Sequence, residues 1–156
     1  MTEDTAATKA VTGPRDPGAA QAARELPRDH VQVCLPAEGA YLSVLRTATA
    51  GLAARLDFTL DEIEDLRIAV DEACAMLLAQ AIPGSNLECA FDLGADEMTI
   101  IVSVVAARPR IPARDTFAWT VLSALAGTVD SRLGPDDQVS IVLRKRRGTA
   151  SGSRSG

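Results

Sequence analysis

One stretch, Thr59–Ile82 (TLDEIEDLRIAVDEACAMLLAQAI), constrains the fold of this chain more than any other. Its apolar residues recur every three or four positions, as on one face of an amphipathic helix. These residues are Ile63, Leu66, Val70, Ala73, Leu77 and Ala81. Thr59 with Glu62 fits a capping box at the start, and Pro83-Gly84 ends the pattern. We therefore predict one long helix around which the rest of the chain is organised.

The flanking sequence predicts four strands and two more helices. Alternating apolar residues indicate strands over 31–35, 87–93, 98–105 and 139–143. A helix is expected between Pro36 and Arg55, with an inner stripe of Tyr41, Leu45, Ala48 and Leu52. Another is expected over 116–129, with an inner side of Phe117, Val121, Leu122, Leu125 and Val129. This order predicts an α+β two-layer sandwich, in which three helices cover one face of a mixed, mainly antiparallel sheet.

Length and composition indicate one domain with two extensions. Residues 1–29 are rich in Ala, Thr, Pro and Gly, which predicts a disordered arm. Residues 30–145 form the predicted domain, and residues 146–156 a flexible basic tail. Between residues 31 and 143 there are 16 Asp and Glu against 7 Arg and no Lys. This acidic body argues against nucleic acid as the ligand and favours a basic protein partner, although charge that only keeps the chain soluble is the alternative.

The cysteines and the histidine exclude several kinds of site. Cys34, Cys74 and Cys89 show no metal-binding or disulfide spacing, so we expect free thiols that serve as small apolar core residues in a reducing compartment. His30 is the single histidine, which argues against a His-based triad and a multi-His metal site. We predict no metal site from the spacing, no membrane span and a cytoplasmic protein, because the chain has neither a long apolar run nor an apolar N-terminal segment.

The segment LRIAVDEACAM, together with the order of elements between Val31 and Lys145, resembles the anti-sigma factor serine kinases of the RsbW/SpoIIAB type. These are members of the GHKL ATPase superfamily, and this Arg-rich, Lys-poor chain is most similar to actinobacterial members. The resemblance implies a homodimer that sequesters an alternative sigma factor of the stress or sporulation (sigma-F-like) type. It also implies release by a STAS-domain anti-anti-sigma factor. Arg46 matches an arginine that contacts the sigma factor in the family, although an arginine that is simply solvated is the alternative.

The nucleotide motifs of that family are only partly present. Glu72 matches the catalytic base, but Met76 stands where the family has the Mg²⁺-binding Asn, and a thioether is a poor ligand for Mg²⁺. The stretch 102–106 lacks the Asp and the glycines of the adenine-binding motif. The stretch 115–120 lacks the glycines of the phosphate-binding turn, although Thr120 matches a family Thr beside the phosphates. ATP and Mg²⁺ are thus implied as cofactors of a weakened site.

Three functions follow, and the sequence leaves them open. The loss of several motifs together favours a binding module that blocks a sigma factor without catalysis. An active serine kinase, which phosphorylates an anti-anti-sigma factor, is the first alternative and depends on Glu72 and Thr120. An adaptor domain of the same fold with an unrelated partner is the second. The identity of the sigma factor, and whether phosphorylation or redox chemistry controls the complex, are not determined by the sequence.

Overall fold

The structure is a computed structural model that describes residues 29–148. The predicted arm and the predicted tail lie almost entirely outside the described residues. The elements in chain order are β1 (His30–Pro36), a short 3-10 helix η1 (Gly39–Tyr41), α3 (Leu42–Arg55), α4 (Leu60–Leu78), β2 (Asn86–Leu93), β3 (Glu97–Val105), α5 (Phe117–Ala126), β4 (Thr128–Leu133) and β5 (Gln138–Arg146). No helix within these residues is both long and apolar enough to cross a membrane.

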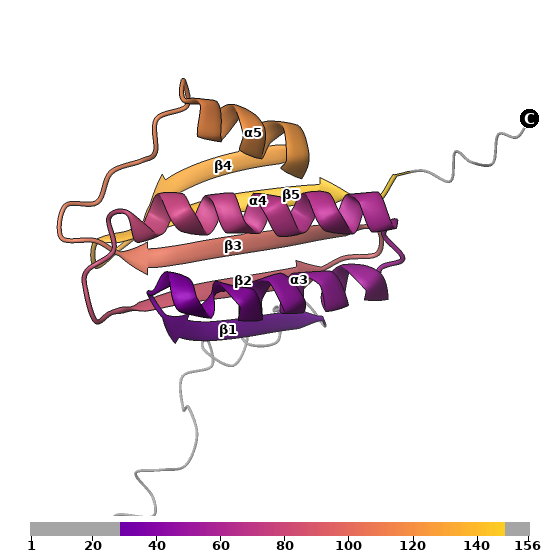
Figure 1. The fold of residues 1–156 in the computed structure, drawn as a ribbon, viewed down its shortest axis with the longest axis horizontal. Coiled ribbons are helices and arrows are strands. Elements are labelled where there is room, and N and C mark those ends of the chain that lie inside the picture. Colours follow the sequence, from indigo (N-terminus) through magenta and orange to yellow (C-terminus); the bar gives the residue numbers. More distant parts are fainter. Residues whose placement is uncertain (1–28, 149–156) are drawn as a thin grey trace, which may run out of the picture.

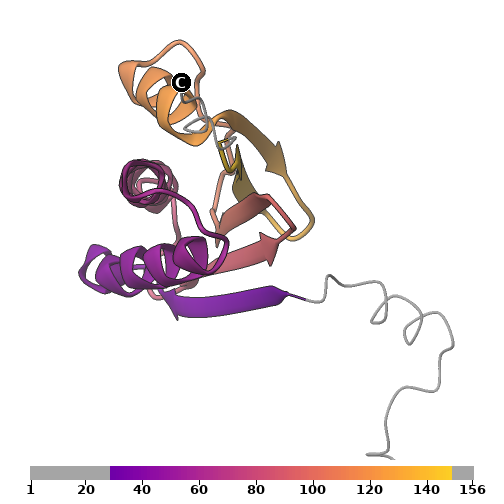
Figure 2. The same cartoon turned by 90° about the vertical axis from the view of Figure 1, so that its right-hand side faces the viewer.

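The described residues form two layers. A five-stranded sheet has the order β1-β2-β3-β5-β4, and α3, α4 and α5 cover one of its faces (Figures 1 and 2). This confirms the predicted α+β sandwich and the central place of β3. Every strand pair is antiparallel, so the sheet is antiparallel throughout rather than mixed.

The fifth strand, β4, was not predicted. The helix expected to continue to residue 129 ends at Ala126, and Val129 instead pairs with Leu143 in the sheet. Gly127 makes the turn with φ of 86°, in the left-handed region that favours glycine. A Cβ at Gly127 would lie 3.0 Å from the carbonyl oxygen of Arg144, so both the turn and the close approach require glycine.

The core lies between α4 and the sheet. The predicted inner face of α4 is confirmed at Leu66, Val70, Ala73 and Leu77, which are fully buried. On the sheet they meet the buried side of β2, β3 and β5, where a row of paired residues, Phe91, Ile100 and Leu143, is also fully buried.

Three residues that the sequence predicted to lie in the core are exposed. Tyr41 is 41% exposed and Phe117 is 82% exposed, whereas Trp119, two positions later, is buried. Periodicity failed at Phe117 because this residue begins α5, where the helix extends beyond the edge of the core. Cys34 is exposed on the edge strand β1, whereas Cys74 and Cys89 are buried as predicted.

The predicted capping box at the start of α4 is confirmed, and its Glu62 also binds the backbone that follows β5. The Thr59 hydroxyl accepts a hydrogen bond from the Glu62 N–H at 3.1 Å, and one Glu62 carboxylate oxygen accepts from the Thr59 N–H at 2.8 Å. The other oxygen accepts from the Gly148 N–H at 2.7 Å. The Arg147 guanidinium also donates to the Leu56 carbonyl at 2.9 Å. Glu62 thus joins the start of α4 to the chain that leaves β5.

We predict that this carboxylate makes stability depend on pH. Partial burial by itself would raise the pKa of Glu62, but the N–H groups of Thr59 and Gly148, the Thr59 hydroxyl and the charge of Lys145 together lower it. A carboxyl group with a lowered folded-state pKa stabilises the fold above its unfolded pKa of about 4.3, and this contribution is lost as pH falls through the folded pKa. Glu62→Gln keeps one acceptor oxygen for the Thr59 N–H, but it loses the negative charge and the acceptor for the Gly148 N–H. The substitution should therefore cost about 1 kcal/mol at pH 7 and progressively less below pH ~4.

Urea unfolding of both proteins between pH 7 and pH 3 measures this difference. Glu64→Gln is the matched control on the same helix, because the Glu64 carboxylate contacts only the exposed Arg67 guanidinium, at 3.2 Å, among the described residues. If Glu62→Gln lowered the free energy of unfolding by the same amount at every pH, the Glu62 carboxylate would not be the source of the pH dependence.

Candidate functional site

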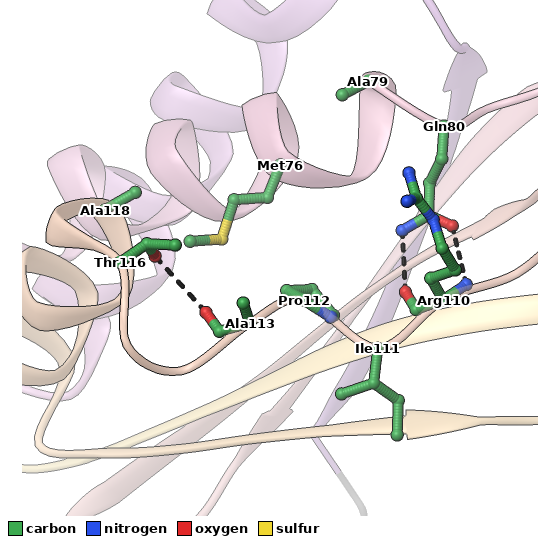
Figure 3. A pocket seen from close by; sticks show the side chains of 9 residues that line it. All are labelled: Met76, Ala79, Gln80, Arg110, Ile111, Pro112, Ala113, Thr116 and Ala118. Carbon is green, nitrogen blue, oxygen red and sulfur yellow. Dashed lines mark hydrogen bonds between the residues drawn. The ribbon is translucent and has the colours of Figure 1, made fainter.

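A cavity of about 390 Å³ lies at the C-terminal end of α4, under the loop that joins β3 to α5 (Figure 3). Met76, which stands where the family has its Mg²⁺-binding Asn, lines this cavity. The family resemblance therefore assigns the cavity to the metal and the phosphates. Most of its wall is apolar. The lining residues are Met76, Ala79, Gln80, Arg110, Ile111, Pro112, Ala113, Thr116 and Ala118.

Side chains hold this loop at both of its ends. The Gln80 side-chain amide donates to the Arg110 carbonyl at 2.8 Å, and its oxygen accepts from the Arg110 N–H at 2.9 Å (Figure 3). At the other end, the Arg114 guanidinium donates to Asp130 at 2.9 Å and lies 4.9 Å from the centre of the Trp119 ring. The Ser131 N–H and the Arg114 guanidinium hold the pKa of the Asp130 carboxyl below its usual range. The loop is thus fastened to α4, α5 and β4.

We predict that Gln80→Ala releases the first of these attachments. The two hydrogen bonds together contribute roughly 2 kcal/mol, so the Arg110 amide should exchange its hydrogen about 30-fold faster, while core amides keep their protection. Hydrogen exchange followed by mass spectrometry measures this. Gln80→Glu keeps the acceptor and loses the donor, so it should give an intermediate rate. Equal exchange in all three proteins would show that the amide does not hold the loop.

The cavity brings together Met76 and Thr116 but not the two predicted nucleotide residues. Glu72 lies one helical turn before Met76 on α4, partly exposed and outside the lining. The Thr120 hydroxyl is exposed and donates to the Thr116 carbonyl at 3.1 Å. Thr116, which we did not predict as a site residue, is the N-cap of α5 and accepts from the Trp119 N–H. Thr116 was predicted as the first residue of the helix, and the preference for threonine at an N-cap could have indicated this role.

The residues at the cavity do not fit a Mg²⁺–phosphate group. No carboxylate or Asn lines it, and Mg²⁺ prefers oxygen ligands. Residues 29–148 also contain no cluster of three His, Cys, Asp or Glu side chains that could hold a metal. At the start of α5 the Trp119 N–H, which could have met a phosphate, already donates to Thr116. The stretch that corresponds to the adenine-binding motif and lacks its Asp and glycines is part of the sheet and the core, since Val102 and Val104 are buried.

The buried thiols do not offer a nucleophile either. Burial raises the pKa of the Cys74 thiol to about 12 and raises that of Cys89 further. Both therefore stay protonated at neutral pH, where a thiol is unreactive. The third thiol, Cys34, lies on the opposite face of the sheet.

Arg46 occupies a different surface, on the outer side of α3 and α4. One guanidinium nitrogen donates to both Asp71 carboxylate oxygens, at 3.0 and 3.1 Å, across the two helices. Both side chains are more than a third exposed, at 38% and 37%. The second terminal nitrogen of Arg46 makes no ion pair in the described part of the chain, so the guanidinium can meet an acidic group from solvent while Asp71 fixes its direction.

The five-stranded antiparallel sheet with three helices on one face places the domain in a class: it is consistent with an α+β domain of GHKL-like fold. The chain is similar to particular proteins within it. It is 34% identical over 90 residues to anti-sigma-F factor RsbW of Mycobacterium tuberculosis, which covers 58% of this chain and 54% of that protein. It is 33% identical over 78 residues to serine-protein kinase RsbW of Bacillus subtilis, which covers 48% of this chain and 49% of that protein.

A second Bacillus relative and a solved structure are also RsbW proteins or contain an RsbW domain. Serine-protein kinase RsbW of Bacillus cereus is 31% identical over 109 residues, covering 70% of this chain and 60% of that protein. A crystal structure of the RsbU and RsbW domains of Rv1364c from Mycobacterium tuberculosis matches with a TM-score of 0.60 at 15% identity, over 78% of this chain and 33% of that one, and so supports the fold. No family model matches the chain. The predicted resemblance to RsbW proteins is confirmed, and the chain spans about half the length of the first curated relatives.

Proposed function

We propose that this protein is an anti-sigma factor that binds an alternative sigma factor and keeps it from core RNA polymerase. The observation that carries the proposal is the 34% identity with anti-sigma-F factor RsbW. Blocking a sigma factor requires a surface and no chemistry, so it is compatible with a cavity that does not fit Mg²⁺ and phosphates. A STAS-domain anti-anti-sigma factor would compete for the protein, and two copies would form the active homodimer.

The outer surface of α3 and α4 supports this function. Arg46 is directed outward there by Asp71, at the position where the family resemblance places a sigma-factor contact. Buried or half-buried arginines are among the residues that contribute most to protein interfaces, because one guanidinium meets several acceptors. We assign Arg46 to the interface with the sigma factor.

The alternative is a serine kinase that acts on the anti-anti-sigma factor. Two observations favour it. Glu72 matches the catalytic base of the family and lies one helical turn before Met76, which lines the cavity. Some of the similar proteins are named serine-protein kinase. Glu72 would accept the proton of the substrate hydroxyl, and Thr120 would contact phosphate. The chemistry of the cavity wall supports this alternative less well than simple binding.

A mixing experiment tests these functions. The full chain is combined with the stress- or sporulation-type sigma factor of its own organism and passed through a sizing column, with and without Mg-ATP. We expect a stable complex whose elution does not change with nucleotide. Failure to hold the sigma factor under either condition would overturn the proposal and leave an adaptor domain. A complex that requires Mg-ATP, together with labelling of a STAS protein that Glu72→Ala abolishes, would establish the kinase.

A further inference from the structure

The cavity beneath the loop between β3 and α5 has no part in the proposed function, because the sigma factor is assigned to the outer surface of α3 and α4. Its volume of about 390 Å³ lies within the range of about 300–1,000 Å³ that is usual for small-molecule sites. An apolar molecule that covered its wall would remove that wall from water and gain the free energy of burial. The cavity therefore has the size and the surface of a ligand site.

The middle of the cavity is apolar. The Met76 side chain crosses it and faces Ala113 and Thr116 (Figure 3). Ile111 and Pro112 extend the apolar wall, and Ile111 is 48% exposed. The thioether of a methionine is flexible and polarizable, so it adapts to ligands of different shape. This wall favours a ligand with an apolar body.

The polar groups in the wall are already paired. The Gln80 amide oxygen and one of its N–H groups bind the backbone of Arg110. The Thr116 hydroxyl donates to the Ala113 carbonyl at 3.3 Å and accepts from the Trp119 N–H at 3.1 Å. An apolar ligand leaves these bonds in place, whereas a polar body would have to compete with them or stay unsatisfied itself. Hydrogen bonding therefore also selects an apolar body.

One unpaired cation stands at one end of this wall. Arg110 lines the cavity, and Figure 3 shows its guanidinium beside the Gln80 side chain. Within residues 29–148 this guanidinium makes no ion pair, whereas Arg114, at the other end of the loop, pairs with Asp130. Of the described residues, no Asp or Glu lines the cavity. An anionic group is therefore favoured at the Gln80 end alone.

We propose that this cavity binds a small amphipathic carboxylate, a molecule with an apolar body and one negative charge. The body lies against Met76, Ile111 and Ala113, and the carboxylate accepts hydrogen bonds from the Arg110 guanidinium, whose planar fork matches its two oxygens. Gln80 positions this arginine, because it holds the Arg110 backbone from both sides. The inference goes beyond the proposed function and does not depend on it.

An NMR titration of the ¹⁵N-labelled full chain tests this proposal, with octanoate and octan-1-ol as the probes. We expect octanoate to shift the amide signals of Ala79, Ile111 and Ala113, and to leave those of the strand β1 unchanged. Octan-1-ol carries the same chain without the charge. An exposed ion pair strengthens binding by up to about fivefold, so octanoate should have a dissociation constant about three- to fivefold lower than octan-1-ol.

Arg110→Ala tests the position of the carboxylate. The variant should bind octanoate and octan-1-ol equally, because the cation that distinguishes them is gone. Arg108→Ala is the matched control, since Arg108 is exposed on the same loop but does not line the cavity. This control should keep the preference for octanoate. If Arg110→Ala kept the preference as well, the carboxylate would not lie at Arg110 and the proposed ligand class would be wrong.

The length of the apolar chain tests the position of the body. Each buried methylene group strengthens binding about fourfold, so octanoate should bind about 15-fold more tightly than hexanoate. Ala113→Phe fills the cavity opposite Met76 and should remove this difference. Ala107→Phe, at an exposed position of the same loop outside the lining, should keep it. The amide spectrum of each variant shows whether it folds, and Ala118→Phe fills the cavity from α5 if Ala113→Phe does not fold.

Mg-ATP, added to the same labelled chain, separates this ligand class from a nucleotide. We expect no shift at Ala79, Ile111 or Ala113, because one guanidinium without a Mg²⁺ site does not balance the charge of a triphosphate. Shifts of these amides at a lower concentration of Mg-ATP than of octanoate would assign the cavity to a nucleotide and overturn the proposal. Octanoate that shifts none of them would overturn it too, and neither result alters the test of sigma-factor binding on the sizing column.

Discussion

Phe91→Ala should lower the free energy of unfolding by about 3–5 kcal/mol, the largest single effect that we expect in this protein. Phe91 is the largest fully buried side chain of the described residues, and it lies on β2 within the core cluster. Its removal loses the transfer free energy of the ring and leaves a cavity that the surrounding strands cannot close. Denaturant unfolding at neutral pH measures the change.

Phe117→Ala is the matched control for this prediction. The substitution removes the same atoms, but Phe117 is 82% exposed at the start of α5. Exposed substitutions away from caps usually change stability by less than about 0.5 kcal/mol. Comparable losses in the two variants would mean that Phe117, as its sequence pattern suggested, belongs to the core.

Arg46→Ala should weaken binding of the sigma factor about 30-fold, which corresponds to about 2 kcal/mol. Asp71 holds this guanidinium on the outer surface of α3 and α4, and the loss of the guanidinium also leaves the Asp71 carboxylate there without its cation. Titration calorimetry or biolayer interferometry measures the affinity, and a thermal melt shows whether the fold is affected. The exposed Arg46–Asp71 pair itself should contribute little to stability.

Arg55→Ala provides the matched control on the same helix. Arg55 ends α3 and is exposed, so its removal should change the affinity by less than threefold. An unchanged affinity in Arg46→Ala would remove Arg46 from the interface. Equal losses in both variants would show that the partner responds to the net charge of α3 rather than to one guanidinium.

The sequence by itself determined the elements whose patterns are local. The helix from Thr59 was predictable because its apolar spacing and its capping box are encoded within a few residues. The hairpin of β2 and β3 was predictable for the same reason, since alternating apolar residues on both strands face one core. The RsbW resemblance followed from the same helix.

Only the tertiary structure decided the features that depend on distant residues. β4 has one buried residue, Ser131, and no apolar alternation, so it becomes a strand only because β5 supplies hydrogen bonds to its backbone. The cavity likewise exists because Gln80 holds Arg110, thirty residues away, and brings Met76 opposite Thr116. Side-chain hydrogen bonds and strand pairing over such separations leave no periodic trace in a sequence. The strand register likewise brings Asp92 and Arg144 into one row of the sheet, although more than fifty residues of chain separate them.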